Sequence, residues 1–177
     1  MNLANKLTLL RIAMIPFFIA VMLTNFGGEY SNWIAFGIFL VASITDKIDG
    51  TIARKYNMIT NFGKFMDPIA DKLLVASALI CLLQTGKVSV LVVLIILGRE
   101  LIISGFRLVA VDNGEIIAAS VSGKIKTVAQ MTMICLLLAD LEILSIVTLI
   151  TVIIAVITTI TSMIEYMYKN KSVLTDC

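Results

Sequence analysis

The stretch ILSIVTLITVIIAVITTITSMIEYM, residues 143–167, is an almost continuous apolar run. A membrane-spanning helix needs roughly 20 mainly apolar residues, so this run is long enough to cross a bilayer once. Five further apolar runs precede it, and short stretches rich in glycine and polar residues separate them. These five runs cover residues 7–26, 33–53, 62–83, 88–111 and 125–138, and we expect the last of them to begin earlier, near Ser122.

The composition of the whole chain agrees with a membrane protein. Apolar residues make up 59% of its 177 residues and charged residues 15%, with a mean hydropathy of +1.02. A typical soluble protein has roughly 45–50% apolar and roughly 25% charged residues. This balance excludes a soluble enzyme, a nucleic-acid-binding domain and a disordered chain. We therefore predict an all-α integral membrane bundle of six transmembrane helices that forms a single domain over residues 1–177.

The placement of the positive charges predicts the orientation of these helices. Six spans put both termini on the same side of the membrane. Of the 14 lysines and arginines, all but Lys87 lie on the side of the termini, if the two arginines inside the fourth run belong to its nearer half. Cytoplasmic segments carry an excess of lysine and arginine. The sequence thus predicts a multi-pass protein of the cell membrane with both termini in the cytoplasm.

Histidine and cysteine chemistry is nearly absent from the sequence. The chain has 0 histidines, which excludes a histidine general base or a histidine-ligated zinc ion. Its 3 cysteines are far apart in sequence. Cys81 and Cys135 lie in apolar runs, where a free cysteine usually packs as a small apolar side chain. The chemistry must therefore come from other residues.

Four aspartates lie near the cytoplasmic ends of the second and third runs, where charged side chains are costly. An aspartate at the middle of a membrane costs roughly 2.5–3.5 kcal/mol, so something must compensate. Asp46 and Asp49 are three residues apart and Asp67 and Asp71 four apart, so each pair lies on one face of a helix. Because the connection between the two runs is short, we expect both pairs to face each other.

Four clustered carboxylates repel one another unless cations lie between them. Hard divalent ions prefer oxygen ligands, so the pattern predicts a site for two ions, Mg²⁺ or Mn²⁺. Gly50, Ala53 and Gly63 leave room for a ligand or a backbone to approach closely. The alternative is a set of interfacial ion pairs between the aspartates and Lys47, Arg54, Lys64 and Lys72.

The spacing of these residues resembles the signature of a known enzyme family. Residues 46–71 fit the pattern D-x2-D-G-x2-A-R-x8-G-x3-D-x3-D at all eight fixed positions, which is the signature of the CDP-alcohol phosphotransferases. Segments 5–11, 98–100, 106–107 and 123–127 are similar to the bacterial branch of this family that uses sn-glycerol 3-phosphate.

The resemblance implies a reaction and an assembly. Such enzymes are homodimers of six-helix protomers whose active site faces the cytoplasm among membrane lipids. They transfer the phosphatidyl group of CDP-diacylglycerol to an alcohol and release CMP. By this resemblance, Asp46, Asp49, Asp67 and Asp71 bind the two metal ions, and Asp71 is also the general base.

Further residues are candidates for binding the donor, CDP-diacylglycerol. Arg54 can reach the diphosphate with its planar guanidinium group, although a role in contacting lipid headgroups is an alternative. Asn5 and Thr8 could complete the nucleotide pocket, although they could equally serve to start the first helix. With the small residues of the signature, the predicted donor site comprises Asn5, Thr8, Gly50, Ala53, Arg54 and Gly63.

The acceptor sn-glycerol 3-phosphate carries its own phosphate, so a second anion site is needed. Arg99 and Arg107 lie two turns apart in the fourth run, and Lys124 and Lys126 flank the start of the fifth helix, where backbone N–H groups favour anions. Pairing of Arg99 with Glu100, and a purely topological role of the two lysines, are the alternatives. We predict one displacement in which Asp71 takes the proton of the attacking hydroxyl.

Two other functions are compatible with parts of this pattern. The same chemistry could act on inositol phosphate, serine or phosphatidylglycerol instead of glycerol 3-phosphate. A small cation transporter could also use carboxylates inside a membrane. However, transporters place charges near the midplane with access from both sides, whereas these aspartates lie in one half. No nucleic-acid partner is expected.

Overall fold

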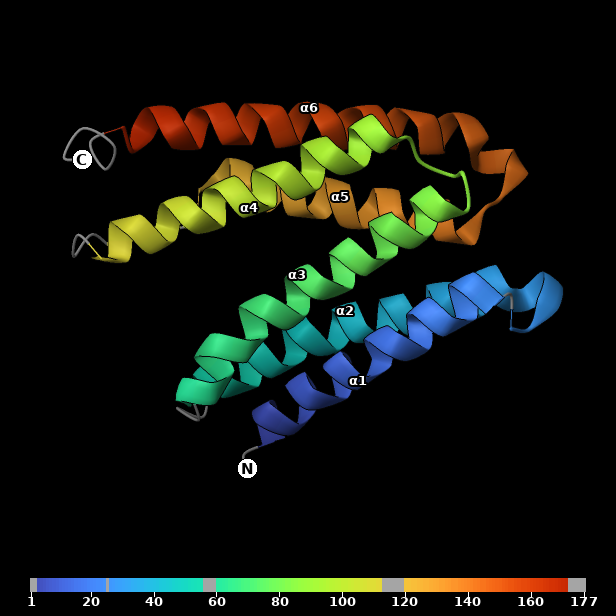
Figure 1. Ribbon diagram of the computed structural model, residues 1–177, viewed down its shortest axis with the longest axis horizontal. Coiled ribbons are helices and arrows are strands. Elements are labelled where there is room, and N and C mark those ends of the chain that lie inside the picture. The colour runs from blue at the N-terminus through green and yellow to red at the C-terminus, as the bar shows by residue number, and fades with distance from the viewer. Residues whose placement is uncertain (1–2, 25, 56–59, 113–119, 172–177) are drawn as a thin grey trace. The chain divides into compact units, whose positions relative to one another are not determined.

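The computed structural model describes residues 3–24, 26–55, 60–112 and 120–171, and for residues 3, 4, 47–55, 61, 64 and 112 only the backbone. Within these ranges the chain is all-helical and contains six long helices (Figure 1). A short 3-10 helix precedes the second of them and another precedes the sixth. The long helices are α1 (Leu3–Thr24), α2 (Ser31–Lys55), α3 (Asn61–Gln84), α4 (Val90–Asp112), α5 (Val121–Ala139) and α6 (Ser145–Lys169), and the short ones are η1 (Gly28–Tyr30) and η2 (Glu142–Leu144).

The six helices correspond to the six predicted apolar runs, with ends that differ by a few residues. Helix α5 begins at Val121, close to the expected start near Ser122. Helix α1 begins at Leu3, before the predicted run, so that Asn5 and Thr8 lie inside it. The all-helical prediction is therefore confirmed for the described part of the chain.

Within the described ranges, three segments are long and apolar enough to cross a membrane: Asn5–Thr24, Val121–Ala139 and Glu142–Lys169. Only 11% of the most apolar window of the last segment is buried within the protein, which leaves its isoleucines exposed. Helices α2, α3 and α4 have apolar stretches but carry charged residues of the predicted sites. The structure thus supports three membrane spans directly and leaves the six-span topology as a prediction.

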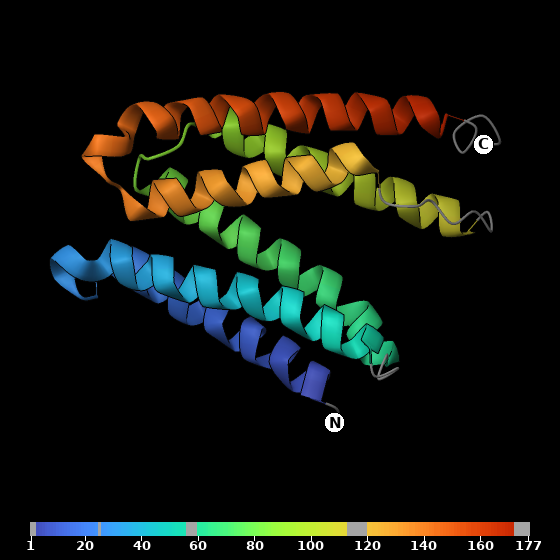
Figure 2. The ribbon, with the colours of Figure 1, turned by 180° about the vertical axis from the view of Figure 1, so that it is seen from behind.

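The helices form two compact units. The first contains α1, α2 and α3 with residues 138–140, and the second contains α4, α6 and most of α5. In the first unit, α1 packs along both α2 and α3, whereas α2 and α3 contact each other less. Figures 1 and 2 show these three helices from opposite sides. Alanines at the helix interfaces, among them Ala35 and Ala78, are fully buried and allow this close approach.

Aromatic side chains fill the cores of both units. In the first unit the rings of Phe18 and Phe39 are both fully buried, with their centroids 6.3 Å apart. In the second unit Phe106 of α4 meets Tyr166 of α6 edge to face, with centroids 5.7 Å apart. Such pairs favour specific packing beyond the area that they bury. They fix α1 against α2 and α4 against α6.

Candidate active site

Helix α1 presents a polar face to the core of the first unit. Asn5, Thr8 and Arg11 recur every three residues, which places them along one face of the helix. Their exposed fractions are 7%, 1% and 0%, so each needs a polar partner inside the protein. The partners of Thr8 and Arg11 are two aspartates of the predicted metal site.

Arg11 forms an ion pair with Asp46 of α2. Its Nη1 lies 2.6 Å from Asp46 Oδ1, and the Asp46 side chain remains 33% exposed. From the sequence, Arg11 was only a cytoplasmic positive charge and part of the segment 5–11, so this contact was not predicted. Its register with Thr8, together with the need of a buried arginine for a counter-charge, was the signal that could have revealed it.

Thr8 holds the second anchored aspartate. Its Oγ1 donates a hydrogen bond of 2.6 Å to Asp67 Oδ1 on α3. Together the two contacts let one helix fix one motif carboxylate on α2 and one on α3. Helix α1 therefore contacts one member of each pair of aspartates, and the expectation that the two pairs face each other stays a prediction, because the Asp49 side chain lies outside the described part of the structure. Carboxylates that bind metals are commonly oriented by such hydrogen bonds.

Gly63 lies in a cradle of oxygen atoms. A Cβ atom at this position would lie 3.4 Å from each of Asn5 Oδ1, Thr60 Oγ1 and Asp67 Oδ2. Thr60 also caps α3, because its Oγ1 accepts a hydrogen bond of 3.0 Å from Gly63 N, and it donates one of 2.8 Å to Asn5 Oδ1. The predicted donor-site residues Asn5 and Gly63 are therefore neighbours, joined by Thr60.

Thr60 was not among the predicted site residues. A threonine directly before a helix is a typical N-cap, and that signal was available in the sequence. Asn5, for which helix starting was the alternative role, instead accepts a hydrogen bond from another segment. The oxygen-rich surroundings of Gly63 are chemically suited to a hard cation or to a polar part of a substrate.

For several predicted site residues the structure describes only the backbone: Asp49, Gly50, Ala53 and Arg54. Asp71 is described and half-buried on α3, one turn beyond Asp67. Among the side chains that are described, no group of three or more histidines, cysteines, aspartates or glutamates could hold a metal ion. The four-carboxylate site therefore stays a prediction. The oxygen atoms of Asp46, Asp67 and the Gly63 cradle are of the kind that a hard divalent cation prefers as ligands.

The second unit contains two of the predicted acceptor contacts in one cluster. Arg99 Nη1 lies 3.3 Å from Glu100 Oε1, and Lys126 Nζ contacts the same carboxylate oxygen. The exposed fractions of the three side chains are 9% for Arg99, 3% for Lys126 and 22% for Glu100. The pairing that we had left open for Arg99 is thus present, and Lys126 shares it.

This cluster lies next to the start of α5. Ser120 Oγ accepts a hydrogen bond of 3.1 Å from Gly123 N, which caps the helix. A Cβ atom on Gly123 would lie 3.2 Å from Ser120 Oγ and 3.8 Å from Arg99 Nη2. Arg99 is therefore close to a helix N-terminus, which favours anions. Lys124, in the first turn, is exposed.

Arg107 contacts α6. Its Nε donates a hydrogen bond of 3.3 Å to the Tyr166 hydroxyl, and its guanidinium carbon lies 5.7 Å from the centre of that ring. Tyr166 is buried, whereas Arg107 is exposed. The aromatic ring and hydroxyl thus hold the guanidinium group at the surface of the second unit.

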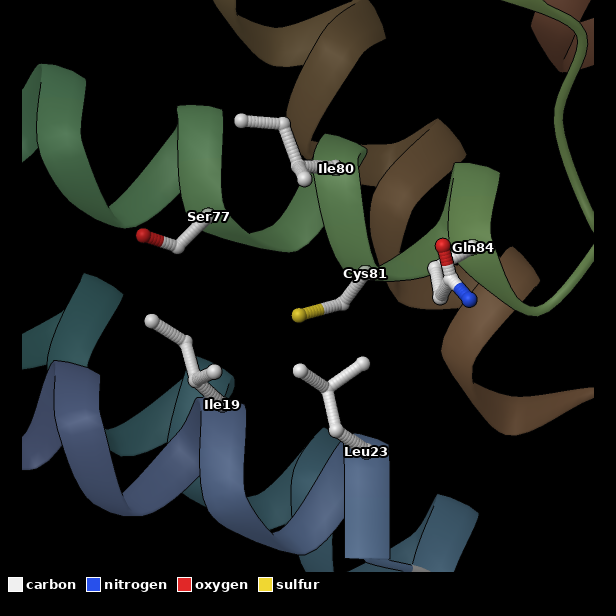
Figure 3. A pocket seen from close by; sticks show the side chains of 6 residues that line it. All are labelled: Ile19, Leu23, Ser77, Ile80, Cys81 and Gln84. Atoms are coloured by element: carbon white, nitrogen blue, oxygen red, sulfur yellow. The ribbon is translucent and has the colours of Figure 1, made fainter.

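An apolar pocket of about 380 Å³ lies between α1 and α3, away from the aspartates. Figure 3 shows Ile19 and Leu23 of α1 opposite Cys81 of α3, which is buried as predicted for a packing residue. With a rise of 1.5 Å per residue, Ser77 at its near end lies about 15 Å along α3 from Asp67. The pocket is lined by Ile19, Leu23, Ser77, Ile80, Cys81 and Gln84.

The chain is similar to curated enzymes from several bacteria. It is 47% identical over 147 residues to the CDP-diacylglycerol–glycerol-3-phosphate 3-phosphatidyltransferase of Bacillus subtilis (strain 168), which covers 77% of this chain and 76% of the relative. A Rickettsia bellii (strain RML369-C) enzyme of the same name is 43% identical over 136 residues, covering 77% of this chain and 74% of the relative.

A third relative carries a different name. The probable phosphatidylglycerophosphate synthase of Mycobacterium tuberculosis (strain ATCC 25618 / H37Rv) is 47% identical over 135 residues, covering 75% of this chain and 64% of the relative. Residues 1–161 match the family described as CDP-alcohol phosphatidyltransferase, which includes every predicted site residue. On this match and on the residues arranged around Asp46 and Asp67, the chain belongs to the CDP-alcohol phosphatidyltransferase family.

Proposed function

We propose that this protein transfers the phosphatidyl group of CDP-diacylglycerol to sn-glycerol 3-phosphate, giving phosphatidylglycerophosphate and CMP. The observation that carries the proposal is the anchoring of two signature aspartates, Asp46 and Asp67, by the buried face of α1. The chain belongs to a family of CDP-alcohol phosphatidyltransferases. The names of two of the relatives described above specify glycerol 3-phosphate, which favours this acceptor over serine, inositol phosphate or phosphatidylglycerol.

In the proposed reaction the acceptor hydroxyl attacks phosphorus directly. Asp71 takes the proton from this hydroxyl. The hydroxyl oxygen of the acceptor then forms a bond to the phosphorus that carries the diacylglycerol. The bond between that phosphorus and the oxygen of CMP breaks, and CMP leaves with the electron pair. Arg54 binds the diphosphate and orients it for the attack. The chain has 0 histidines, so a carboxylate is the natural base.

The signature aspartates are proposed to bind two divalent cations, Mg²⁺ or Mn²⁺. The ligands would be Asp46, Asp49, Asp67 and Asp71. When bound, such ions neutralise the diphosphate and stabilise the leaving group. Arg11 and Thr8 orient two of the four carboxylates in advance, as the ion pair and the hydrogen bond indicate. The absence of a side chain at Gly63 keeps the oxygen cradle open for the polar part of the donor.

The acceptor phosphate is proposed to bind in the second unit. Arg99 and Lys126 lie in one cluster beside the N-terminus of α5, and Lys124 is in the first turn of that helix. Arg107, held by Tyr166, provides a further guanidinium group. Charge-assisted contacts of this kind suit a phosphate better than a neutral alcohol.

The two units are proposed to form one catalytic domain, because the family match runs through both of them. We further propose that all six helices cross the cell membrane, with both termini and the active site on the cytoplasmic side. The charge asymmetry of the sequence supports this orientation. A homodimer among membrane lipids is proposed from the resemblance to the family.

The direct test offers the purified protein CDP-diacylglycerol with one radiolabelled alcohol at a time. We expect a labelled lipid and an equal amount of CMP with glycerol 3-phosphate, and none with serine, inositol phosphate or phosphatidylglycerol. Chelation with EDTA should abolish the reaction, and added Mg²⁺ or Mn²⁺ should restore it. A labelled lipid formed only from another alcohol would refute the acceptor, and full activity in excess EDTA would refute the metal site. Absence of CMP release together with cation uptake into vesicles would instead favour a transporter.

A further inference from the structure

We infer that the Glu100 carboxylate competes with the phosphate of the acceptor for the side chains of Arg99 and Lys126. It pairs with both cations while no acceptor is bound, and it is displaced when the acceptor phosphate binds. The inference rests on the proposed function, because it assigns Arg99 and Lys126 to the acceptor phosphate. It adds a positioning residue, Glu100, that controls the affinity of this site.

The geometry places one carboxylate oxygen between two buried cations. Glu100 Oε1 contacts both Arg99 Nη1 and Lys126 Nζ, which come from α4 and α5. Two cations buried side by side without an anion would repel each other and lose their hydration. Glu100 relieves this repulsion and holds both groups at the start of α5 while no acceptor is bound.

Glu100 leaves part of the guanidinium group of Arg99 unused. Arg99 Nε is buried and has no hydrogen-bond partner among the residues that the structure describes. Arg99 Nη2 lies toward Gly123, which has no side chain to fill the space beside the capped end of α5. A guanidinium group can bind phosphate through two parallel hydrogen bonds. A phosphate could therefore use donors of Arg99 that the carboxylate does not reach.

Exposure indicates which member of the cluster moves. The Glu100 side chain is 22% exposed, whereas Arg99 and Lys126 are at least nine-tenths buried. The carboxylate can therefore turn toward water while the two cations stay in place. Once displaced, it still lies near a phosphate of the same charge sign, so that its presence weakens acceptor binding.

The test compares the binding of inorganic phosphate to the full-length protein and to three variants by calorimetry in detergent. Glu100→Gln should bind phosphate at least about 10-fold more tightly, because it removes the competing charge. Glu100→Asp keeps the charge on a shorter side chain, so its affinity for phosphate should lie between those of the unchanged protein and Glu100→Gln. The control Glu142→Gln removes an exposed charge in the same unit, outside the cluster, and should bind phosphate as the unchanged protein does.

Kinetics provide the second readout. In Glu100→Gln the KM for glycerol 3-phosphate should fall while kcat does not rise. Unchanged or weaker phosphate binding in both Glu100 variants overturns the inference, and so does a change in kcat alone. Glu100→Asp keeps the test open if Glu100→Gln does not fold. If phosphate binding follows the expected series but no variant uses glycerol 3-phosphate, the inference holds and the proposed acceptor is wrong.

Discussion

At the scale of single residues, we expect the buried Arg11 to stabilise the first unit through its ion pair with Asp46. Loss of a charge-assisted hydrogen bond costs about 1.5–3 kcal/mol, and Asp46, which is 33% exposed, can become hydrated when its partner is lost. We therefore expect Arg11→Met to lower the free energy of unfolding by about 1.5–3 kcal/mol, with weaker Mn²⁺ binding because Asp46 is no longer held in place. Arg11→Lys should recover only part of the lost stability and Mn²⁺ affinity, because a single ammonium group cannot reproduce the guanidinium geometry.

The measurements for Arg11 are unfolding in detergent and Mn²⁺ titration by electron paramagnetic resonance. Lys6→Met is the matched control, because Lys6 is an exposed cation on the same helix. It should change neither quantity. Equal effects of Arg11→Met and Lys6→Met would show that the ion pair with Asp46 is not what stabilises the site.

A second prediction at this scale concerns Asp71. If Asp71 takes the acceptor proton, Asp71→Asn should reduce kcat by at least about 10²-fold. The control Glu29→Gln removes an exposed carboxylate in η1 and should keep full activity. Turnover near the original rate in Asp71→Asn, with Mn²⁺ still bound, would contradict the assignment of the base.

The two arginines of the substrate sites should separate kinetically. Loss of one charge-assisted hydrogen bond costs about 1.5–3 kcal/mol, which corresponds to about 10- to 150-fold in binding. Arg107→Ala should raise the KM for glycerol 3-phosphate by this factor and leave the KM for CDP-diacylglycerol nearly unchanged. Arg54→Ala should do the reverse. If Arg107→Ala weakens only donor binding, the division into two substrate sites is incorrect.

At the scale of helices, a substitution at Gly63, near the start of α3, tests whether the oxygen cradle takes part in donor binding. Gly63→Ala places a methyl group 3.4 Å from each of three oxygen atoms. We expect a loss of about 10-fold or more in kcat/KM for the donor, because the methyl group would fill the space that the polar part of the donor is proposed to occupy and would shift the donor from its reactive position. Gly37→Ala on α2 is the matched control, since a Cβ atom there meets nothing within 4 Å.

The control should keep its activity and gain stability, because alanine favours a helix over glycine by about 0.5–1 kcal/mol. Both variants are assayed for donor kinetics and for unfolding in detergent. A gain in stability without loss of activity in Gly63→Ala would show that the cradle has no part in donor binding.

The helices could be predicted from the sequence far better than their contacts. Apolar runs separated by polar stretches predicted each of the six helices to within a few residues, because a helix that buries side chains or crosses a membrane needs such a run. The signature spacing also placed Asp46 and Asp67 on the correct helices. The contacts of Arg11 and Thr60 depend on how α1 lies against α2 and α3, and periodicity within one helix cannot reveal that.

At the scale of the whole molecule, the charged residues of the predicted sites affect which helices qualify as membrane spans by composition. Among the residues that the structure describes, three segments meet the requirements for length and apolarity, whereas α2, α3 and α4 carry charged residues of the predicted sites. A charged residue that serves a site lowers the mean hydropathy of the helix that carries it. If all six helices cross the membrane, as we propose, composition alone underestimates the number of spans.

Cysteine labelling of intact cells tests the six-span topology. In a background without Cys81, Cys135 and Cys177, we expect Glu29→Cys to react with a membrane-impermeant maleimide added from outside. Lys171→Cys should react only after the membrane is permeabilised. Both positions are exposed in the structure, so burial within the protein does not limit labelling. The opposite pattern would invert the topology, and labelling of both from outside would exclude an even number of spans.

The pairing of Arg11 with Asp46 also has a consequence for biogenesis. Arg11 lies on α1, and its partner lies on α2, which is synthesised later. At about 5–20 residues per second, synthesis of the intervening segment takes on the order of seconds. During that interval the newly inserted helix must keep its guanidinium group at the headgroup level, where a long side chain can reach water. We expect the pairing with Asp46 to form only once α2 has been inserted, so that the final position of α1 and the assembly of the proposed metal site depend on the same contact.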